Sequence, residues 1–321
     1  MLYIGFDDID HRLNWCAIAD SLEVGHRLEK AQIGDLLLKD RDRSLLNRGS
    51  WIKGLGLALK SVSVFPENNT RTPPIPSIQG AMLLFDDETG GLKAVMDGVL
   101  VTKWKTAGDS VLGARLLARP ESRRLLVVGA GTVARSLFEA YREIFPALNS
   151  FAIWNRNAAK AELLAAELAG QGIEVEVVRD LAEAAASADI ISCATMAKSP
   201  VLKGAWIQPG THVDLIGAYR EDMREADDEL MRKAEIFVDS RETTLEDIGE
   251  LSIPLASGVI TQSDVKGDLY DLCNGGAGRS GSDAITLYKN GGGAHLDLMT
   301  GAVIYEIFNK TDDGGGSLVS G

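Results

Sequence analysis

Short hydrophobic runs alternate with amphipathic stretches through the middle of the chain, from about residue 120 to residue 245. The runs are rich in Val, Ile and Leu, as expected of buried strands, and the stretches between them have the hydrophobic spacing of helices. The predicted strands are RRLLVVGAG, FAIWN, EVEVV, DIISCAT, THVDLIG and EIFVDS. The predicted helices are TVARSLFEAYREI, NAAKAELLAAELAGQG, LAEAAASA and READDELMRKA. This alternation predicts an α/β fold with a Rossmann-type, doubly wound parallel sheet.

Both ends of the chain lack this alternation. Residues 57–65 have strand character, and residues 79–98 form two apolar runs around the turn residues DDETGG, which predicts a hairpin. The segment NGGGAHLDLMTGAVIYEIF is predicted to run from a glycine-rich loop into a helix. We interpret residues 1–118 and 290–321 as one α+β domain into which a nucleotide-binding domain of residues 119–289 is inserted.

The composition narrows the class of protein. The chain has 321 residues, of which 45% are hydrophobic and 25% charged, and its formal net charge is −13 at pH 7. This acidity argues against nucleic-acid and anionic-membrane partners, because both need a basic face. The four histidines lack metal-ligand spacing, so no metal site is expected, and the three widely separated cysteines are expected to be reduced. The N-terminus lacks the features of a signal peptide, so a cytoplasmic protein is expected.

The sequence VVGAGTVA contains the pattern G-x-G-x-x-A, formed by Gly129, Gly131 and Ala134. The pattern alone is weak, but here it follows a predicted strand and opens a predicted helix within a βαβ unit. Glycines at these positions let the backbone approach a pyrophosphate, which binds at the positive end of the helix. We therefore expect a dinucleotide cofactor at this loop.

The end of the second predicted strand bears on the choice between the two nicotinamide cofactors. An acidic residue there would bind the ribose hydroxyls of NAD(H), whereas this chain has Asn155 and Arg156. Arg156 can pair with a 2′-phosphate, and Lys160 lies one helical turn further on. We therefore predict that NADPH is preferred, with NADH as the alternative. The competing interpretation of Arg156 is a solvated arginine at a helix start.

Two lysines lie at positions where a charge is costly or informative. Lys60 alternates onto the same strand face as Ala58 and Val62, which would place an ammonium on an apolar face. It is either an anchor for a substrate carboxylate or an edge residue whose stem reaches water. Lys105 has Asp109 four residues later, so it is either a functional cation or half of a surface ion pair.

Longer stretches of the chain resemble one known family. In order, LKSVSVFPEN, PSIQGAMLLFDDETGGLKAVMDG, KTAGDSVLGARLLARP, GAGTVA, SCATMAKSPVL, GTHVDLIGA, IFVDSRE and YKNGGGAHLD resemble segments of the ornithine cyclodeaminase/μ-crystallin family. The resemblance covers nearly the whole chain. It implies a homodimer whose substrate-binding and dimerisation domain is formed by both chain ends, with an inserted Rossmann domain.

The resemblance also implies roles for individual residues. Arg48 and Lys60 match positions that bind the substrate carboxylate, and Lys105 stands where the family usually has arginine, which keeps the charge but loses the bidentate fork. Asp297 matches a recurrent acid, and IWNR resembles the NADPH-using branch of the family. The positions that match cofactor contacts are Ser77, Ala130, Thr132, Val133, Asn155, Arg156, Thr195, Met196, Ile216 and Asn290.

The chain departs from the family pattern at one further place, in the segment after the fifth predicted strand. The cyclodeaminases have an aspartate there that handles a proton, whereas this chain has Tyr219. Its loss argues against ornithine deamination with ring closure and favours reduction of a substrate that arrives as an imine. Tyr219 joins Arg48, Lys60 and Lys105 as a candidate catalytic residue, although a phenol is a poor acid near neutral pH and a pocket wall is the favoured role.

We therefore expect an NAD(P)H-dependent reductase of a cyclic 2-imino acid. Δ1-Pyrroline-2-carboxylate, which gives proline, is the preferred substrate, and the six-membered piperideine homologue, which gives pipecolate, is the next candidate. Three alternatives remain open: a reductase of an acyclic imino acid of the iminosuccinate or alanine type, an ornithine cyclodeaminase, and a non-catalytic NADPH-binding protein like the crystallins of the family.

Overall fold

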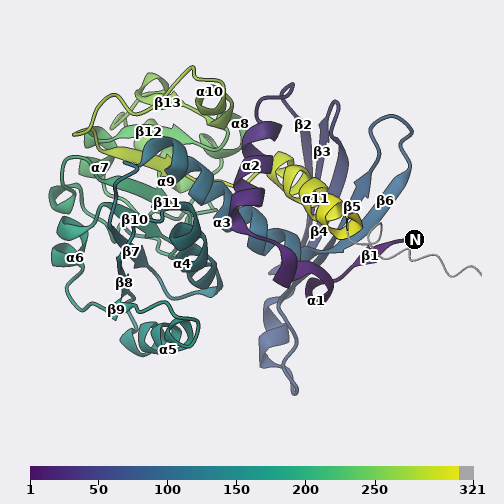
Figure 1. Ribbon diagram of the computed structural model, residues 1–321, viewed down its shortest axis with the longest axis horizontal. Coiled ribbons are helices and arrows are strands. Elements are labelled where there is room, and N and C mark those ends of the chain that lie inside the picture. Colours follow the sequence, from purple (N-terminus) through teal and green to yellow (C-terminus); the bar gives the residue numbers. More distant parts are fainter. Residues whose placement is uncertain (311–321) are drawn as a thin grey trace, which may run out of the picture. The chain divides into compact units, whose positions relative to one another are not determined.

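The computed structural model describes residues 1–310 of the chain (Figure 1). The chain divides into two compact units. One is formed by residues 1–105 with the C-terminal segment from Ala294, and the other by residues 106–293. We call them unit 1 and unit 2. The domain boundaries predicted from the sequence are 118/119 and 289/290. Helix α3 (Gly98–Leu117) accounts for most of the difference, because its residues divide between the units. No helix among the described residues is long and apolar enough to span a membrane.

Unit 1 is a six-stranded sheet whose strands follow the order β1-β6-β5-β4-β3-β2. The strands are β1 (Tyr3–Ile4), β2 (Gln32–Asp40), β3 (Arg43–Ile52), β4 (Gly56–Val64), β5 (Ile78–Phe85) and β6 (Leu92–Asp97). The unit's helices besides the first part of α3 are α1 (Phe6–Ile9), α2 (Trp15–Gly25) and α11 (Ala294–Asn309). The predicted strand at 57–65, the hairpin at 79–98 and the C-terminal helix are confirmed, whereas β2 and β3 were not predicted.

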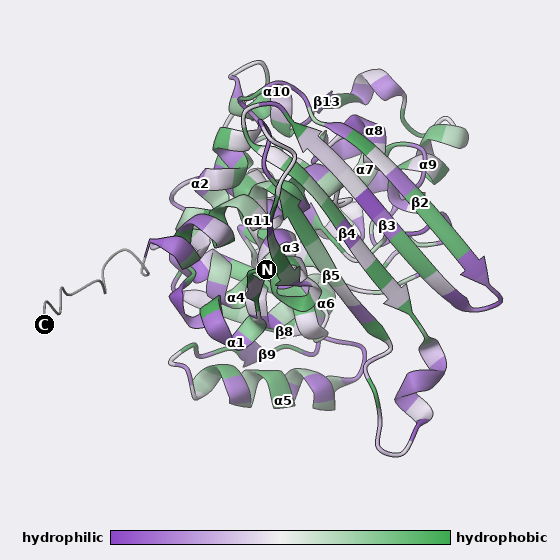
Figure 2. Cartoon of the chain, turned by 90° about the vertical axis from the view of Figure 1, so that its right-hand side faces the viewer, coloured by the Kyte–Doolittle hydropathy of each residue, from purple (hydrophilic) through white to green (hydrophobic). Residues whose placement is uncertain are grey.

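The two faces of this sheet differ in what covers them. Helix α11 packs on one face, where Ala58 and Met82 are buried and where a Cβ on Gly301 of α11 would meet the Met82 side chain. The opposite face carries Trp51 and Leu59, which are 46% and 38% exposed. Figure 2 shows hydrophobic stretches along the strands of the unit 1 sheet. Unit 1 thus leaves a broad apolar surface uncovered in the single chain.

Unit 2 is an eight-stranded parallel sheet with the order β13-β12-β14-β11-β10-β7-β8-β9. Its strands are β7 (Arg124–Val128), β8 (Ser150–Trp154), β9 (Glu176–Val177), β10 (Ile190–Cys193), β11 (His212–Leu215), β12 (Glu235–Val238), β13 (Val265–Gly267) and β14 (Thr286–Lys289). Its helices besides α3 are α4 (Thr132–Ile144), α5 (Ala158–Ala169), α6 (Leu181–Ser187), α7 (Asp228–Lys233), α8 (Arg241–Thr244), α9 (Gly249–Ala256) and α10 (Leu269–Cys273).

The predicted doubly wound architecture of unit 2 is confirmed, with differences in detail. The third predicted strand shrinks to the two residues of β9, and β13 and β14 were not predicted. The helix predicted over READDELMRKA is wrong in its first turn, because α7 begins only at Asp228. The residues before it are not helical, Ala226 forms a bridge with Leu202, and Asp227 is an extended N-cap.

The strand order fixes where a ligand can bind. The chain runs from β7 outward to β8 and β9, and then returns to β10 on the other side of β7. Ligands of open α/β sheets bind at the carboxyl ends of the strands beside such a reversal. The strand reversal between β7 and β10 therefore marks the candidate cofactor edge of unit 2.

The sheet of unit 2 also contains a buried acid, Asp214 of β11. Its carboxylate accepts hydrogen bonds from the hydroxyls of Ser110, Tyr141 and Ser192.

Candidate active site

The glycine loop lies at the carboxyl end of β7, as predicted. Gly129 has a φ of +116°, and a Cβ built on it would lie 2.6 Å from the carbonyl oxygen of Ala194, which follows β10. Only glycine fits this conformation and this approach. Gly131 is the N-cap of α4 and provides no side-chain cap, so the first N–H groups of the helix remain available to an anion. The loop has the form that a pyrophosphate needs.

Asn155 connects the end of β8 to this loop. Its Oδ1 accepts a hydrogen bond of 3.2 Å from the Ala130 N–H, and its Nδ2 donates to the carbonyl oxygen of Asn157 at 2.7 Å. Arg156 and Lys160 are exposed, and Arg156 makes no ion pair with any described residue. This end of the sheet therefore offers a cation, where an acid would exclude a 2′-phosphate.

The remaining predicted cofactor positions of unit 2 fall on the same edge. Thr195 and Met196 follow β10, Ile216 follows β11, and Asn290 follows β14. Met196 is 74% exposed, whereas Asn290 is buried and its Nδ2 donates to the carbonyl oxygen of Thr106. Thr132 and Val133 open α4 beside the glycine loop. Ser77 belongs to unit 1, in the segment before β5, where its carbonyl oxygen accepts a hydrogen bond from the Phe65 N–H.

A row of charged side chains crosses the sheet of unit 1 beneath α11. The register places Asp35, Arg48 and Lys60 side by side on β2, β3 and β4, so all three share one face. The Arg48 Nε donates to the Asp35 carboxylate at 2.9 Å. The Lys60 Nζ lies 2.6 Å from Oδ1 of Asp297 on α11, and both side chains are buried.

This geometry excludes one of the two interpretations of Lys60. Strand β4 lies between β3 and β5, so Lys60 is an interior residue of the sheet, and the interpretation as an edge residue that reaches water is wrong. An ammonium has three N–H donors. Within the described residues Lys60 hydrogen-bonds only to Asp297, which leaves two donors for a ligand. The second oxygen of Asp297, Oδ2, is buried and has no hydrogen-bond partner among the described residues.

Lys105 and two histidines complete a buried polar cluster in unit 1. Lys105 is 7% exposed, so it does not lie on the surface, where the ion-pair interpretation would place it. The rings of His26 and His295 meet edge to face, with centroids 5.3 Å apart. Burial lowers the pKa of His295 well below its ordinary value, and the positive charges of Lys105 and Arg48 act in the same direction. The cluster is therefore electropositive, with His295 neutral at physiological pH, and suits an anionic ligand.

Tyr219 lies in unit 2, in the loop after β11, and its side chain is 56% exposed. Its hydroxyl makes no hydrogen bond within residues 1–310. Sequence reasoning did not single out His295, Glu225 or Lys289, which the structure buries next to candidate site residues. A histidine two residues before Asp297 was the available signal for His295, whereas nothing in the local pattern marks the other two.

Comparison with known proteins agrees with this arrangement. The ornithine cyclodeaminase/mu-crystallin family model matches residues 50–312. The chain belongs to this family. A Δ1-pyrroline-2-carboxylate reductase of Paracoccus denitrificans (strain Pd 1222) is 51% identical over 306 residues, which cover 95% of this chain and 96% of that protein.

Two solved structures are similar in fold over nearly the whole chain. The Thermococcus litoralis Δ1-pyrroline-2-carboxylate reductase, in complex with NADH and L-proline, has a TM-score of 0.89 and 30% identity and covers 99% of this chain and 100% of its own. An archaeal alanine dehydrogenase dimer with bound NAD has a TM-score of 0.88 and 27% identity, with coverage of 100% and 99%. Both of these similar proteins are enzymes solved with a nicotinamide cofactor bound.

Proposed function

We propose that this protein is an NAD(P)H-dependent oxidoreductase that reduces Δ1-pyrroline-2-carboxylate to proline. The observation that carries the proposal is the 51% identity, across nearly the full length of both chains, with a reductase of that substrate. The buried cations of unit 1 and the glycine loop of unit 2 supply the two kinds of binding site that the reaction needs.

Arg48 and Lys60 bind the substrate carboxylate. They are neighbours across β3 and β4, and Lys60 has two N–H donors left after its bond to Asp297. A planar carboxylate that accepts from both side chains is fixed in position and orientation. Lys105 adds a third cation, buried like Lys60, and the positive cluster favours the anion before any specific contact forms.

Asp297 favours an imine over the corresponding 2-oxo acid. The imine carries an N–H when protonated, and the buried Oδ2 of Asp297 can accept that hydrogen bond, whereas a ketone oxygen next to the carboxylate would be repelled. When the cofactor is bound, its nicotinamide supplies the hydride that reduces the C=N carbon. Orientation by the carboxylate anchor and charge stabilisation by Asp297 are the contributions of unit 1.

Unit 2 binds the cofactor, and we propose a preference for NADPH. The N–H groups at the start of α4 and the approach at Gly129 suit the pyrophosphate. The exposed guanidinium of Arg156 pairs with the 2′-phosphate, and Lys160 adds charge one turn later. Asn155 keeps the end of β8 next to the glycine loop through its bond to Ala130.

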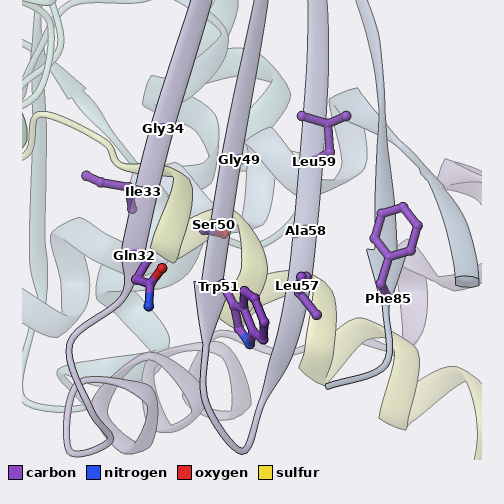
Figure 3. A pocket seen from close by; sticks show the side chains of 10 residues that line it. All are labelled: Gln32, Ile33, Gly34, Gly49, Ser50, Trp51, Leu57, Ala58, Leu59 and Phe85. Carbon is purple, nitrogen blue, oxygen red and sulfur yellow. The ribbon is translucent and has the colours of Figure 1, made fainter. Parts of the chain in front are cut away.

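We further propose that two copies associate through the apolar face of the unit 1 sheet. Figure 3 shows that Trp51, Leu57, Leu59 and Phe85 line a shallow pocket on β3, β4 and β5. An uncovered sheet face of this kind is unfavourable in water and is typical of an interface. A similar protein, the archaeal alanine dehydrogenase, is a dimer, which supports a second copy as the occupant.

The test is oxidation of NADPH and NADH, followed at 340 nm, by the purified protein with Δ1-pyrroline-2-carboxylate, beside the piperideine homologue, iminosuccinate and iminopyruvate. Ornithine with NAD⁺ is measured in parallel. We expect the highest kcat/KM with Δ1-pyrroline-2-carboxylate and NADPH, and no turnover of ornithine. Faster turnover of an acyclic imino acid, or ring closure of ornithine, would contradict the proposal.

A further inference from the structure

A cluster of buried charged side chains lies directly behind the cofactor edge of unit 2. It consists of Glu225, in the non-helical segment before α7, Glu250 of α9 and Lys289 of β14. All three are fully buried. Buried charges are costly unless hydrogen bonds satisfy them, so the bonds they make show what the cluster holds in place.

Glu225 holds the loops that follow β10 and β11 together. One carboxylate oxygen accepts from the Thr195 N–H at 2.6 Å and from the Thr195 hydroxyl at 2.8 Å, and the other accepts from the Gly217 N–H at 2.7 Å. A Cβ on Gly217 would lie 1.8 Å from the Thr195 carbonyl oxygen, so the two loops approach as closely as glycine allows. One side chain therefore fixes the separation of two strand ends.

Lys289 holds the loop after β11 to the end of β14. Its ammonium donates to the carbonyl oxygens of Leu215 at 3.0 Å and Asn290 at 2.6 Å, with Ile216 at 3.5 Å. These are backbone acceptors, so the bonds constrain the path of the chain at both strand ends. Together, Glu225 and Lys289 tie three adjacent strand ends into one rigid edge.

Glu250 supports the cluster from behind. Its carboxylate accepts from the N–H groups of Glu225 at 2.6 Å and Ala226 at 3.0 Å. Burial and the charge of Glu225 raise the pKa of Glu250 to about 7, while the Lys289 ammonium acts in the opposite direction. Burial also raises the pKa of Glu225. The cluster thus buries two acids beside one cation, and the hydrogen bonds to backbone N–H groups offset part of that cost.

The position of these three strand ends indicates which half of the cofactor they face. The glycine loop after β7 binds the pyrophosphate, and Asn155 and Arg156 after β8 lie on the adenosine side. A dinucleotide lies across the strand reversal, so its nicotinamide half extends over the ends of β10, β11 and β14. Thr195, Ile216 and Asn290, on these three ends, are therefore the residues next to the nicotinamide.

We infer that Glu225 and Lys289 are positioning residues for the nicotinamide half of the cofactor. They act through Thr195, Ile216 and Asn290 and do not contact the substrate. The inference rests on the proposed cofactor site. It adds that the cluster positions the nicotinamide half of the cofactor, whereas the adenosine half binds independently of the cluster. A loop displaced by a fraction of an ångström would misplace the hydride and reduce turnover.

The test is Glu225→Gln, which keeps the shape but places an NH₂ group against an N–H donor of Thr195 or Gly217. We expect kcat for imine reduction to fall by about tenfold to a hundredfold, the range set by an unsatisfied buried hydrogen bond. The Kd of ADP-ribose and its 2′-phosphate, which lack the nicotinamide, should stay within about twofold, since they use only the adenosine side.

Glu235→Gln is the matched control. Glu235 accepts from the N–H and the hydroxyl of Ser280, as Glu225 does from Thr195, but it lies at the amino end of β12. It should leave kcat unchanged. If Glu225→Gln does not yield folded protein, Glu225→Asp, which keeps the charge but shortens the side chain, provides the same comparison.

Two results would overturn the inference: an unchanged kcat in the Glu225 variant, or an equal loss of ADP-ribose affinity and turnover together with a lower Tm, which would show a general structural role. Failure of the proposed function is distinguishable. If the wild type binds NADPH but reduces no imino acid, kcat cannot be measured. The readout is then the ratio of the Kd values for NADPH and for the 2′-phosphate of ADP-ribose, compared between the wild type and the Glu225 variant. A wild type that binds neither nucleotide would overturn both.

Discussion

Replacing Lys60 by methionine separates the two contributions of the buried ammonium. Methionine approximates the length of the stem but removes the charge and all three donors. The change leaves Asp297 buried with neither of its oxygens paired within the described residues, since Lys60 is the one hydrogen-bond partner of that carboxylate. It also removes the donors proposed for the substrate carboxylate. One substitution is therefore expected to lower both the stability of the fold and the affinity for the substrate.

The two effects have different magnitudes. Removing one partner of a buried ion pair costs about 3–5 kcal/mol of the free energy of unfolding, because the other charge stays buried. A charge-assisted hydrogen bond to the substrate contributes about 1.5–3 kcal/mol, which corresponds to a decrease in kcat/KM of about 10-fold to 150-fold. The loss of stability arises because Asp297 is left buried and unpaired, whereas the loss of substrate affinity arises because the Lys60 ammonium is missing.

A double variant distinguishes these effects. In Lys60→Met/Asp297→Leu, both charges are replaced by apolar groups, so most of the stability should return, since such replacements are often neutral. The low kcat/KM should remain. Denaturant unfolding measures the first quantity, and steady-state oxidation of NADPH with Δ1-pyrroline-2-carboxylate measures the second.

Lys103→Met serves as the control for Lys60→Met. Lys103 pairs with Asp10 at 2.8 Å but is only partly buried and lies outside the proposed site. Its loss should cost less than about 1 kcal/mol and leave KM unchanged. The carboxylate role of Lys60 would be refuted if Lys60→Met left kcat/KM at the wild-type value, or if the double variant restored both quantities together.

Three further predictions concern other parts of the molecule. Arg156→Gln should raise KM for NADPH by about tenfold or more and leave KM for NADH unchanged, since only the 2′-phosphate uses the guanidinium; equal effects on both cofactors in steady-state assays would contradict the assignment. Leu59→Glu should convert the dimer into a monomer with its fold intact, as measured by light scattering and circular dichroism, because a carboxylate cannot be buried unpaired in that interface; a wild type that is already monomeric would contradict the proposed interface. Burial raises the pKa of Asp214 to about 6, above its unfolded value, so the native state binds more protons between about pH 4 and pH 6 and the free energy of unfolding should fall as pH rises through that window. Asp214→Asn should remove this slope in denaturant titrations, whereas an unchanged slope would mean that another group produces it.

The parts of the fold that sequence reasoning could predict are those in which local pattern and burial coincide. Strand β4 alternates clearly because one of its faces lies under α11, and the β7–β8 region repeats the spacing of a βαβ unit. Strands β2 and β3 were missed because the run Leu36–Leu38 leads directly into the charged segment around Arg41. Leu36, Leu37 and Leu38 are 56%, 48% and 53% exposed in the single chain, so the pattern lacks the contrast between a buried face and a solvated one.

The site was predictable only in part, for a similar reason. Local context identified Gly129, and a cation on an apolar strand face identified Lys60, because each feature is visible within a few residues. The partner of Lys60 lies 237 residues away in the sequence, and no local spacing can reveal it. Glu225 was predicted to be helical because its neighbours favour a helix, whereas it lies outside α7 and its side chain is bonded to Thr195 and Gly217. Long-range contacts outweighed local propensity at that position.

The ion pair between Lys60 and Asp297 also has a consequence for the order in which the protein is made. The ribosome completes β4 early, but the carboxylate that neutralises Lys60 emerges 237 residues later, after all of unit 2. At about 5–20 residues per second, the nascent chain carries the unpaired lysine for roughly 10–50 s. During that interval the sheet of unit 1 also lacks α11, so both of its faces are uncovered. Unit 2 can fold as soon as it emerges, whereas unit 1 waits until α11 has been made, and that interval is the stage at which we expect the nascent chain to depend most on chaperones.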